Sequence, residues 1–173
     1  MPKKILILDT SILCCWLKVP GKEEAGPVHD RWDHNRINSL LNLEQKAGSI
    51  FVLPIAALIE TGNHIAQAAD HRHDRAKSLS DCLRSAADGA SPWAAFTDQS
   101  ELWSSENLLL LADNWPALAA KKITIGDATI KDVAEQYAKG PYTVEILTGD
   151  AGLKSYQPIA KPLVPRRRGG ARH

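Results

Sequence analysis

Four acidic residues stand at points of the sequence where chemistry on a phosphate ester could be organised: Asp9, Glu60, Asp127 and Asp150. Asp9 and Asp150 each follow a short apolar run that is typical of a buried strand, whereas Glu60 and Asp127 lie near the starts of helical stretches. Catalytic groups gather beyond the carboxyl ends of the strands in an open parallel sheet. Carboxylates brought together there repel one another, and a bound hard cation such as Mg²⁺ is the usual compensation. The pattern therefore predicts a metal site suited to cleaving phosphate esters.

The elements that must position these acids alternate between strand and helix. Apolar runs rich in strand formers predict three strands, and apolar residues at helical spacing predict the helices between them. The predicted ranges are strands at 4–8, 49–53 and 143–148, an element that begins at 11–17, a loop or surface insertion at 18–36, and helical stretches at 37–46, 54–87 (broken near 70–75), 101–118 and 127–139. This order predicts an α/β domain in which helices cover a short central parallel sheet in three layers.

The charge of the chain is distributed unevenly, although 21 Lys and Arg residues almost balance 20 Asp and Glu residues. Five of those basic residues and none of the acidic ones lie in 161–173. The sequence therefore predicts a single domain over 1–160 and a basic, flexible tail over 161–173. The tail is a candidate substrate-binding segment through Arg166, Arg167 and Arg168, which would contact phosphates by charge alone. A solubilising chain end explains the same residues equally well.

Composition and motifs exclude several other classes of protein. The chain has no apolar stretch near the ~20 residues that a membrane span needs. Its three cysteines, Cys14, Cys15 and Cys82, form neither a disulfide framework nor a metal-ligand spacing. Glycine-rich nucleotide-binding loops and the GxSxG nucleophile motif are absent from the sequence. We therefore expect a cytoplasmic protein that does not associate with membranes.

The four motifs around the acids together resemble those of the PIN-domain nucleases, a family that includes the VapC-like toxin ribonucleases. The motifs read LILDTSIL at 6–13, PIAALIETG at 54–62, IGDATIKDVA at 125–134 and ILTGD at 146–150. The resemblance covers roughly residues 4–153 and implies a PIN-like α/β/α fold. It also implies that the four acids are the catalytic, metal-binding residues for Mg²⁺ or Mn²⁺, supported by Ser11 and Thr148.

The resemblance further implies an endoribonuclease that hydrolyses RNA phosphodiester bonds and leaves a 5′-phosphate and a 3′-hydroxyl. A toxin of a toxin–antitoxin or defence module, with an antitoxin or other protein inhibitor as partner and a homodimeric state, belongs to the same expectation. The loop at 18–36 and the helical middle at 76–122 are longer than in the compact toxins. A stand-alone processing or defence nuclease therefore fits the residues as well.

Each candidate residue also has an ordinary structural explanation. Asp9 suits a helix cap, Asp127 suits the positive end of a helix dipole, and Asp150 after a glycine suits a turn. Glu60 is the hardest to explain in this way, because its neighbours on the helix are apolar. His64, one helical turn after Glu60, is a candidate substrate-binding residue.

Lys131, one turn after Asp127, is a further candidate for substrate binding, although an intrahelical ion pair explains it more simply. Two other functions remain open for the whole chain. The first is a non-catalytic interaction module on the same fold, and the second is a metal-dependent phosphohydrolase that acts on small phosphate esters.

Overall fold

A parallel sheet of three strands lies at the centre of the protein, of which the computed structural model describes residues 2–160. The strands are β1 (Lys3–Leu8), β2 (Ile50–Val52) and β3 (Tyr142–Leu147), in the order β2-β1-β3. Ile5 of β1 lies opposite Ile50 of β2 and Val144 of β3, so β1 is paired on both sides. All three strands and their parallel pairing confirm the prediction from the sequence.

The central strand is apolar on both faces because both faces are covered. Residues 5–8 of β1 are all buried, as expected for a strand between two layers of helices. The free edge of β2 is also covered, since Phe51 N–H donates to Pro92 O and Ala94 N–H donates to Phe51 O, both at 2.8 Å. A short stretch after the fourth helix thereby extends the ladder by one bridge.

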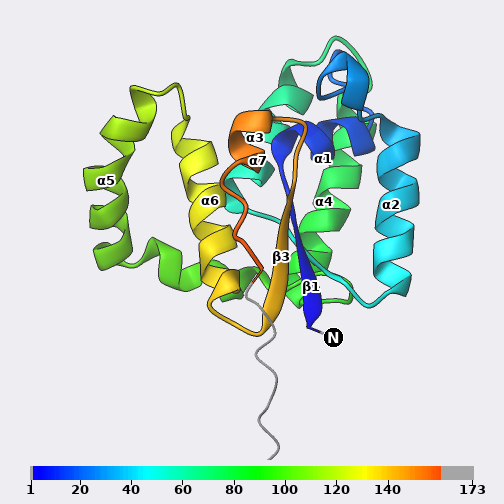
Figure 1. Ribbon diagram of the computed structural model, residues 1–173. Helices are drawn as coiled ribbons and strands as arrows, with labels where there is room; N and C mark the ends of the chain where they lie inside the picture. The colour runs from blue at the N-terminus through cyan, green and yellow to red at the C-terminus, as the bar shows by residue number, and fades with distance from the viewer. Residues whose placement is uncertain (1, 161–173) are drawn as a thin grey trace, which may run out of the picture.

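Seven α-helices and two 3₁₀-helices surround the sheet in the described residues. The α-helices are α1 (Thr10–Trp16), α2 (His34–Lys46), α3 (Ile55–Gln67), α4 (Arg72–Asp88), α5 (Ser105–Ala119), α6 (Ile125–Ala138) and α7 (Ala151–Lys154), and the 3₁₀-helices are Val28–Asp30 and Phe96–Trp103. Helices α5 and α6 lie on one side of β1 and β3, and α2 and α4 lie on the other (Figure 1). This mixed α/β arrangement is consistent with the predicted three layers. None of the helices within 2–160 is long and apolar enough to cross a bilayer.

Some predicted boundaries are wrong, and the caps explain why. The loop predicted at 18–36 ends early, because the Asp33 carboxylate accepts a hydrogen bond from Arg36 N–H at 2.8 Å and starts α2. The helix predicted from 101 starts instead after Ser104, whose hydroxyl accepts a hydrogen bond from Asn107 N–H. Such capping bonds satisfy the exposed N–H groups of a first turn. The break near 70–75 is confirmed, since α3 and α4 are separate helices.

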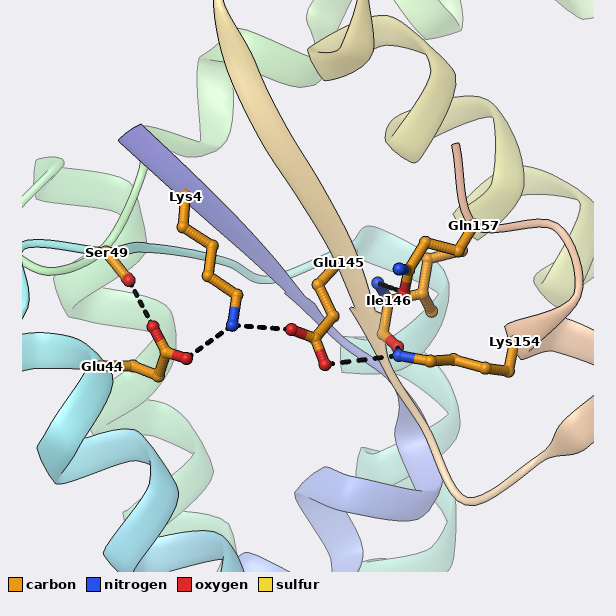
Figure 2. A network of polar contacts seen from close by, with 7 residues as sticks. All are labelled: Lys4, Glu44, Ser49, Glu145, Ile146, Lys154 and Gln157. Atoms are coloured by element: carbon orange, nitrogen blue, oxygen red, sulfur yellow. Dashed lines mark hydrogen bonds and ion pairs between the residues drawn. The ribbon is translucent and has the colours of Figure 1, made fainter. Parts of the chain in front are cut away.

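Charged side chains on the sheet form a chain of contacts, here called the sheet-face network (Figure 2). Lys4 Nζ on β1 lies 2.5 Å from Glu44 Oε1 and 2.7 Å from Glu145 Oε2 on β3. Lys154 of α7 reaches the other oxygen of Glu145 at 3.3 Å and donates to Ile146 O at 2.8 Å. Each carboxylate of the network therefore has an ammonium group beside it.

Candidate functional site

The four acids singled out in the sequence line one cavity of about 350 Å³. Asp9 follows β1 directly, Asp150 precedes α7, Glu60 lies in α3, and Asp127 lies in the first turn of α6. The carboxyl ends of β1 and β3 point toward α1 and α7, which lie at the end of the sheet away from the N-terminus (Figure 1). The parallel topology therefore brings together four acids that are far apart along the chain.

Asp9 is the most firmly held of these acids. It is 5% exposed, and its Oδ2 atom accepts hydrogen bonds from the Ser11 and Thr148 hydroxyl groups, both at 2.8 Å. Ser11 Oγ accepts in turn from Gly149 N–H at 3.0 Å, and Thr148 Oγ1 accepts from Asp150 N–H at 2.9 Å. Ser11 and Thr148 thus link the ends of β1 and β3 and fix the position of the Asp9 carboxylate between them.

Glu60 reaches the same cavity from α3, is hydrogen-bonded by the start of α1 and lies against the start of α6. Thr10 Oγ1 donates a hydrogen bond to Glu60 Oε2 at 3.0 Å. The other oxygen, Oε1, lies so close to Gly126 that a Cβ atom on that residue would overlap it. Gly126 precedes Asp127 directly, so the absence of a side chain there lets two acids from different helices share the cavity.

The acids also influence one another electrostatically. Burial raises the pKa of Asp127; a hydrogen bond from Thr124 lowers it, and the charges of Asp9, Asp150 and Glu60 raise it further, with a net increase over the ordinary value. A carboxylate with three other acids near it is stabilised by positive charge. Burial is the main cause of the raised pKa of Asp127, and the three neighbouring acids add to it.

Further side chains line the cavity, and most of them escaped the sequence analysis. His64 lines it, at the place predicted from its spacing to Glu60. Together with the predicted Ser11, the remaining lining residues are Thr10, Cys14, Lys22, Glu24, Ala25 and Thr124. Burial raises the pKa of the Cys14 thiol to about 11, so this side chain contributes a neutral group. No local sequence signal marks Lys22 or Glu24, because their position depends on how the loop after α1 folds back.

One candidate residue does not line this cavity, and three others cannot be placed relative to it because they lie outside residues 2–160. Lys131 lines a different cavity, beside α5, and forms an ion pair with Glu135 at 2.8 Å. The intrahelical ion pair considered in the sequence analysis is thus present. Arg166, Arg167 and Arg168 lie outside the described residues.

The donor atoms of the cavity suit a hard divalent cation. Carboxylate oxygens are the ligands that Mg²⁺ and Mn²⁺ prefer. Within residues 2–160, no group of three or more His, Cys, Asp or Glu side chains is placed as a set of ligands that could hold a metal ion. Mg²⁺ keeps several waters and takes only one or two carboxylates directly, so such a set is not required. In donor chemistry alone, the four acids therefore suit a hard cation that keeps part of its water shell.

Comparison with known proteins adds no assignment. No protein-family model matches the chain, and no curated protein or solved structure is significantly similar to it. The class of the site consequently follows from its geometry: an acidic cavity with hard-cation donors at the carboxyl ends of a parallel sheet. The resemblance to PIN-domain nucleases stays a prediction based on the four motifs.

Proposed function

We propose that this protein is a Mg²⁺- or Mn²⁺-dependent endoribonuclease that hydrolyses RNA phosphodiester bonds with a PIN-like set of acids. The observation that carries the proposal is that Asp9, Glu60, Asp127 and Asp150 come from four separate elements and line one cavity. Ordinary capping or turn roles explain Asp9, Asp127 and Asp150 singly, but they do not explain why these three acids share one cavity with Glu60.

In this proposal the acids bind the ions, and the neighbouring hydroxyl groups hold the acids in position. The four acids would hold one or two ions, which supply a bound water of lowered pKa and positive charge for the phosphate. Ser11 and Thr148 keep Asp9 in place through its Oδ2 atom. Thr10 does the same for Glu60. A carboxylate that is not occupied by an ion orients the attacking water or accepts its proton.

Cleavage of mixed RNAs by the purified chain tests the proposal. We expect cleavage in Mn²⁺, none in EDTA, and none by the Asp9→Asn variant in either condition. Glu145→Gln is the matched control, because it removes an acid from the sheet-face network and leaves the cavity intact. Cleavage that survives EDTA or Asp9→Asn contradicts the proposal. Turnover of a generic phosphate ester without RNA cleavage would favour the small-ester phosphohydrolase instead.

Thermal unfolding gives a second test that requires no RNA. An ion that binds only the folded state raises its stability by about 2.7 kcal/mol at one hundred times its dissociation constant. We expect Mn²⁺ to raise the midpoint of unfolding of the wild type, and Asp9→Asn to remove most of this increase. A wild type that is insensitive to Mn²⁺ would favour the non-catalytic interaction module.

A further inference from the structure

The segment between α1 and α2 forms one wall of the cavity that the four acids line, here called the carboxylate cavity. Lys22, Glu24 and Ala25 of this segment line the cavity beside the four acids. Val19, close to its start, is completely buried, and Ala25 pairs with Trp32 through two backbone hydrogen bonds of 3.0 and 2.7 Å. Residues 18–33 are here called the wall loop. The buried Val19 anchors the start of this loop, and the backbone pairing of Ala25 with Trp32 closes its second half.

The wall loop is also fitted tightly against the end of β3. A Cβ atom on Gly149 would lie 2.8 Å from both Ala25 Cβ and Gly26 N, closer than such atoms approach in real proteins. Gly26 itself has a positive φ of 85°, and a Cβ there would lie 2.6 Å from Asp30 O. Because Gly149 adjoins Asp150, the wall loop has a fixed position relative to the carboxylates.

The basic residues in and beside the wall loop differ in how their charge is used. Arg31 pairs with Glu24 at 2.6 Å. Arg36, just inside α2, pairs with Asp30 at 2.7 Å and lies 3.6 Å from the centre of the Trp32 ring. Lys22 faces the cavity instead, and among residues 2–160 its ammonium group has neither an ion-pair partner nor a hydrogen bond. Its charge acts on the buried Cys14 thiol, which lines the same cavity.

We propose that Lys22 binds the RNA phosphate that lies at the carboxylates, so that the wall loop supplies the positive charge which the acids lack. The inference rests on the proposed function, since it takes RNA as the occupant of the cavity. An ammonium group is a compact point charge that recognises a phosphate without reading the base. The wall loop therefore favours an RNA that is held by its backbone, independently of sequence.

The test compares Lys22→Ala with Lys22→Arg, and uses Lys18→Ala as a matched control in the same loop but outside the cavity. Steady-state cleavage of a short fluorogenic single-stranded RNA in Mn²⁺ gives KM and kcat. For Lys22→Ala we expect KM to rise about tenfold with kcat within about twofold, as for one lost charge-assisted contact. Lys22→Arg keeps KM within about threefold, and Lys18→Ala leaves it unchanged.

Salt dependence separates a phosphate contact from a structural role. One contact to a single strand contributes about 0.7 to the slope of log affinity against log salt concentration. Binding of the same RNA, measured by fluorescence anisotropy with Ca²⁺ in place of Mn²⁺, should lose that amount of slope in Lys22→Ala alone. The increase of the unfolding midpoint in Mn²⁺ should remain, because Lys22 is exposed and is not one of the acids.

The outcomes distinguish this inference from the proposed function. A wild type that cleaves RNA, with Lys22→Ala equal to it in KM and salt slope, overturns the role of Lys22 and leaves the nuclease intact. A wild type that binds RNA without cleaving it, with weaker binding by Lys22→Ala, supports Lys22 and overturns the nuclease. A wild type that neither binds nor cleaves RNA overturns both.

Discussion

The sheet-face network and the carboxylate cavity both gather charged side chains from separate elements, but they balance this charge differently. In the sheet-face network, Glu44 and Glu145 each contact the ammonium group of Lys4, and Glu145 also contacts Lys154. In the cavity, every hydrogen bond to the four acids within 2–160 comes from a hydroxyl or a backbone N–H group. One region is neutralised by the protein, whereas the other holds acids that only neutral donors contact.

The pKa values of Glu145 in the network and Asp127 in the cavity move in opposite directions for this reason. Burial alone would raise the pKa of Glu145, but the hydrogen bond from Lys4 and the charge of Lys154 lower it below its ordinary value. Burial likewise raises the pKa of Asp127, and the other three acids raise it further. The difference teaches that the network balances its charge within the fold, whereas the acids of the cavity are the ones for which we propose a bound ion.

The largest expected effect comes from Asp127→Asn, which removes one charge from the cavity. Cleavage should fall by at least about a thousandfold, since an ion held by fewer carboxylates stabilises the transition state by several kcal/mol less. Because the folded state raises the pKa of Asp127, its charge opposes folding at neutral pH, so the metal-free variant should unfold at an equal or higher temperature. Single-turnover cleavage and thermal unfolding in EDTA measure the two effects.

Asp132→Asn is the matched control for this prediction. Asp132 lies on the same helix and its pKa is also raised by burial, but it lines the cavity beside α5 instead of the carboxylate cavity. We expect cleavage by this variant to stay within about threefold of the wild type. Equal loss of cleavage in both variants would show that the effect of Asp127→Asn comes from a change in helix α6 and not from the loss of a carboxylate in the cavity.

A smaller but more selective effect is expected from Gly126→Ala. The added Cβ would displace the Glu60 carboxylate, so we expect cleavage to fall about a hundredfold, in the upper range for a change beside a metal ligand. Alanine favours a helix by up to about 1 kcal/mol over glycine, so the metal-free variant should keep its stability or gain some. Mn²⁺ titration followed by thermal unfolding measures the lost ion affinity directly.

Gly62→Ala provides the corresponding control on α3. A Cβ at Gly62 would meet Leu79 Cδ2 at 3.9 Å, an ordinary contact. The same chemical change should therefore gain stability there without altering the response to Mn²⁺ or the rate of cleavage. Normal cleavage by Gly126→Ala would mean that Glu60 can move without consequence, and would remove it from the proposed metal site.

The part of this site that was predictable from the sequence depends on local patterns. Asp9 and Asp150 each follow a short apolar run, so the strands and the acids beyond them could be recognised together. Glu60 stood out because an acid is unusual among the apolar residues that begin α3. Parallel topology then places such residues at one end of the sheet.

The remainder depends on contacts that no local pattern reveals. The sequence marked residues 18–36 only as a loop, and the wall loop reaches the cavity through the buried Val19 and the close contact of Gly26 with Gly149. The role of Gly126 depends likewise on a side chain that belongs to another helix. Long-range packing of this kind determines where Lys22 and Gly126 lie, whereas local apolar runs determine the strands and local caps the starts of helices.

The smallest expected effect belongs to the sheet-face network and concerns stability alone. At neutral pH, Glu145→Gln should lower the free energy of unfolding by about 1 kcal/mol, since it removes hydrogen bonds to charged groups. The folded state lowers the pKa of Glu145, so its contribution is present above the ordinary value of 4.5 and is lost as the pH falls through the folded value. Urea unfolding at several pH values should show the variant and the wild type converging in acid.

Glu135→Gln is the control for this last prediction, because Glu135 forms an ion pair with Lys131 at 2.8 Å but is 54% exposed. Exposed pairs contribute less than about 1 kcal/mol, so this variant should follow the wild type at every pH. Both variants should cleave RNA at the wild-type rate, since neither residue lines the carboxylate cavity. If Glu145→Gln kept the full acid sensitivity of the wild type, the sheet-face network would be no better balanced than the cavity, and the contrast between them would give no reason to propose an ion for the cavity alone.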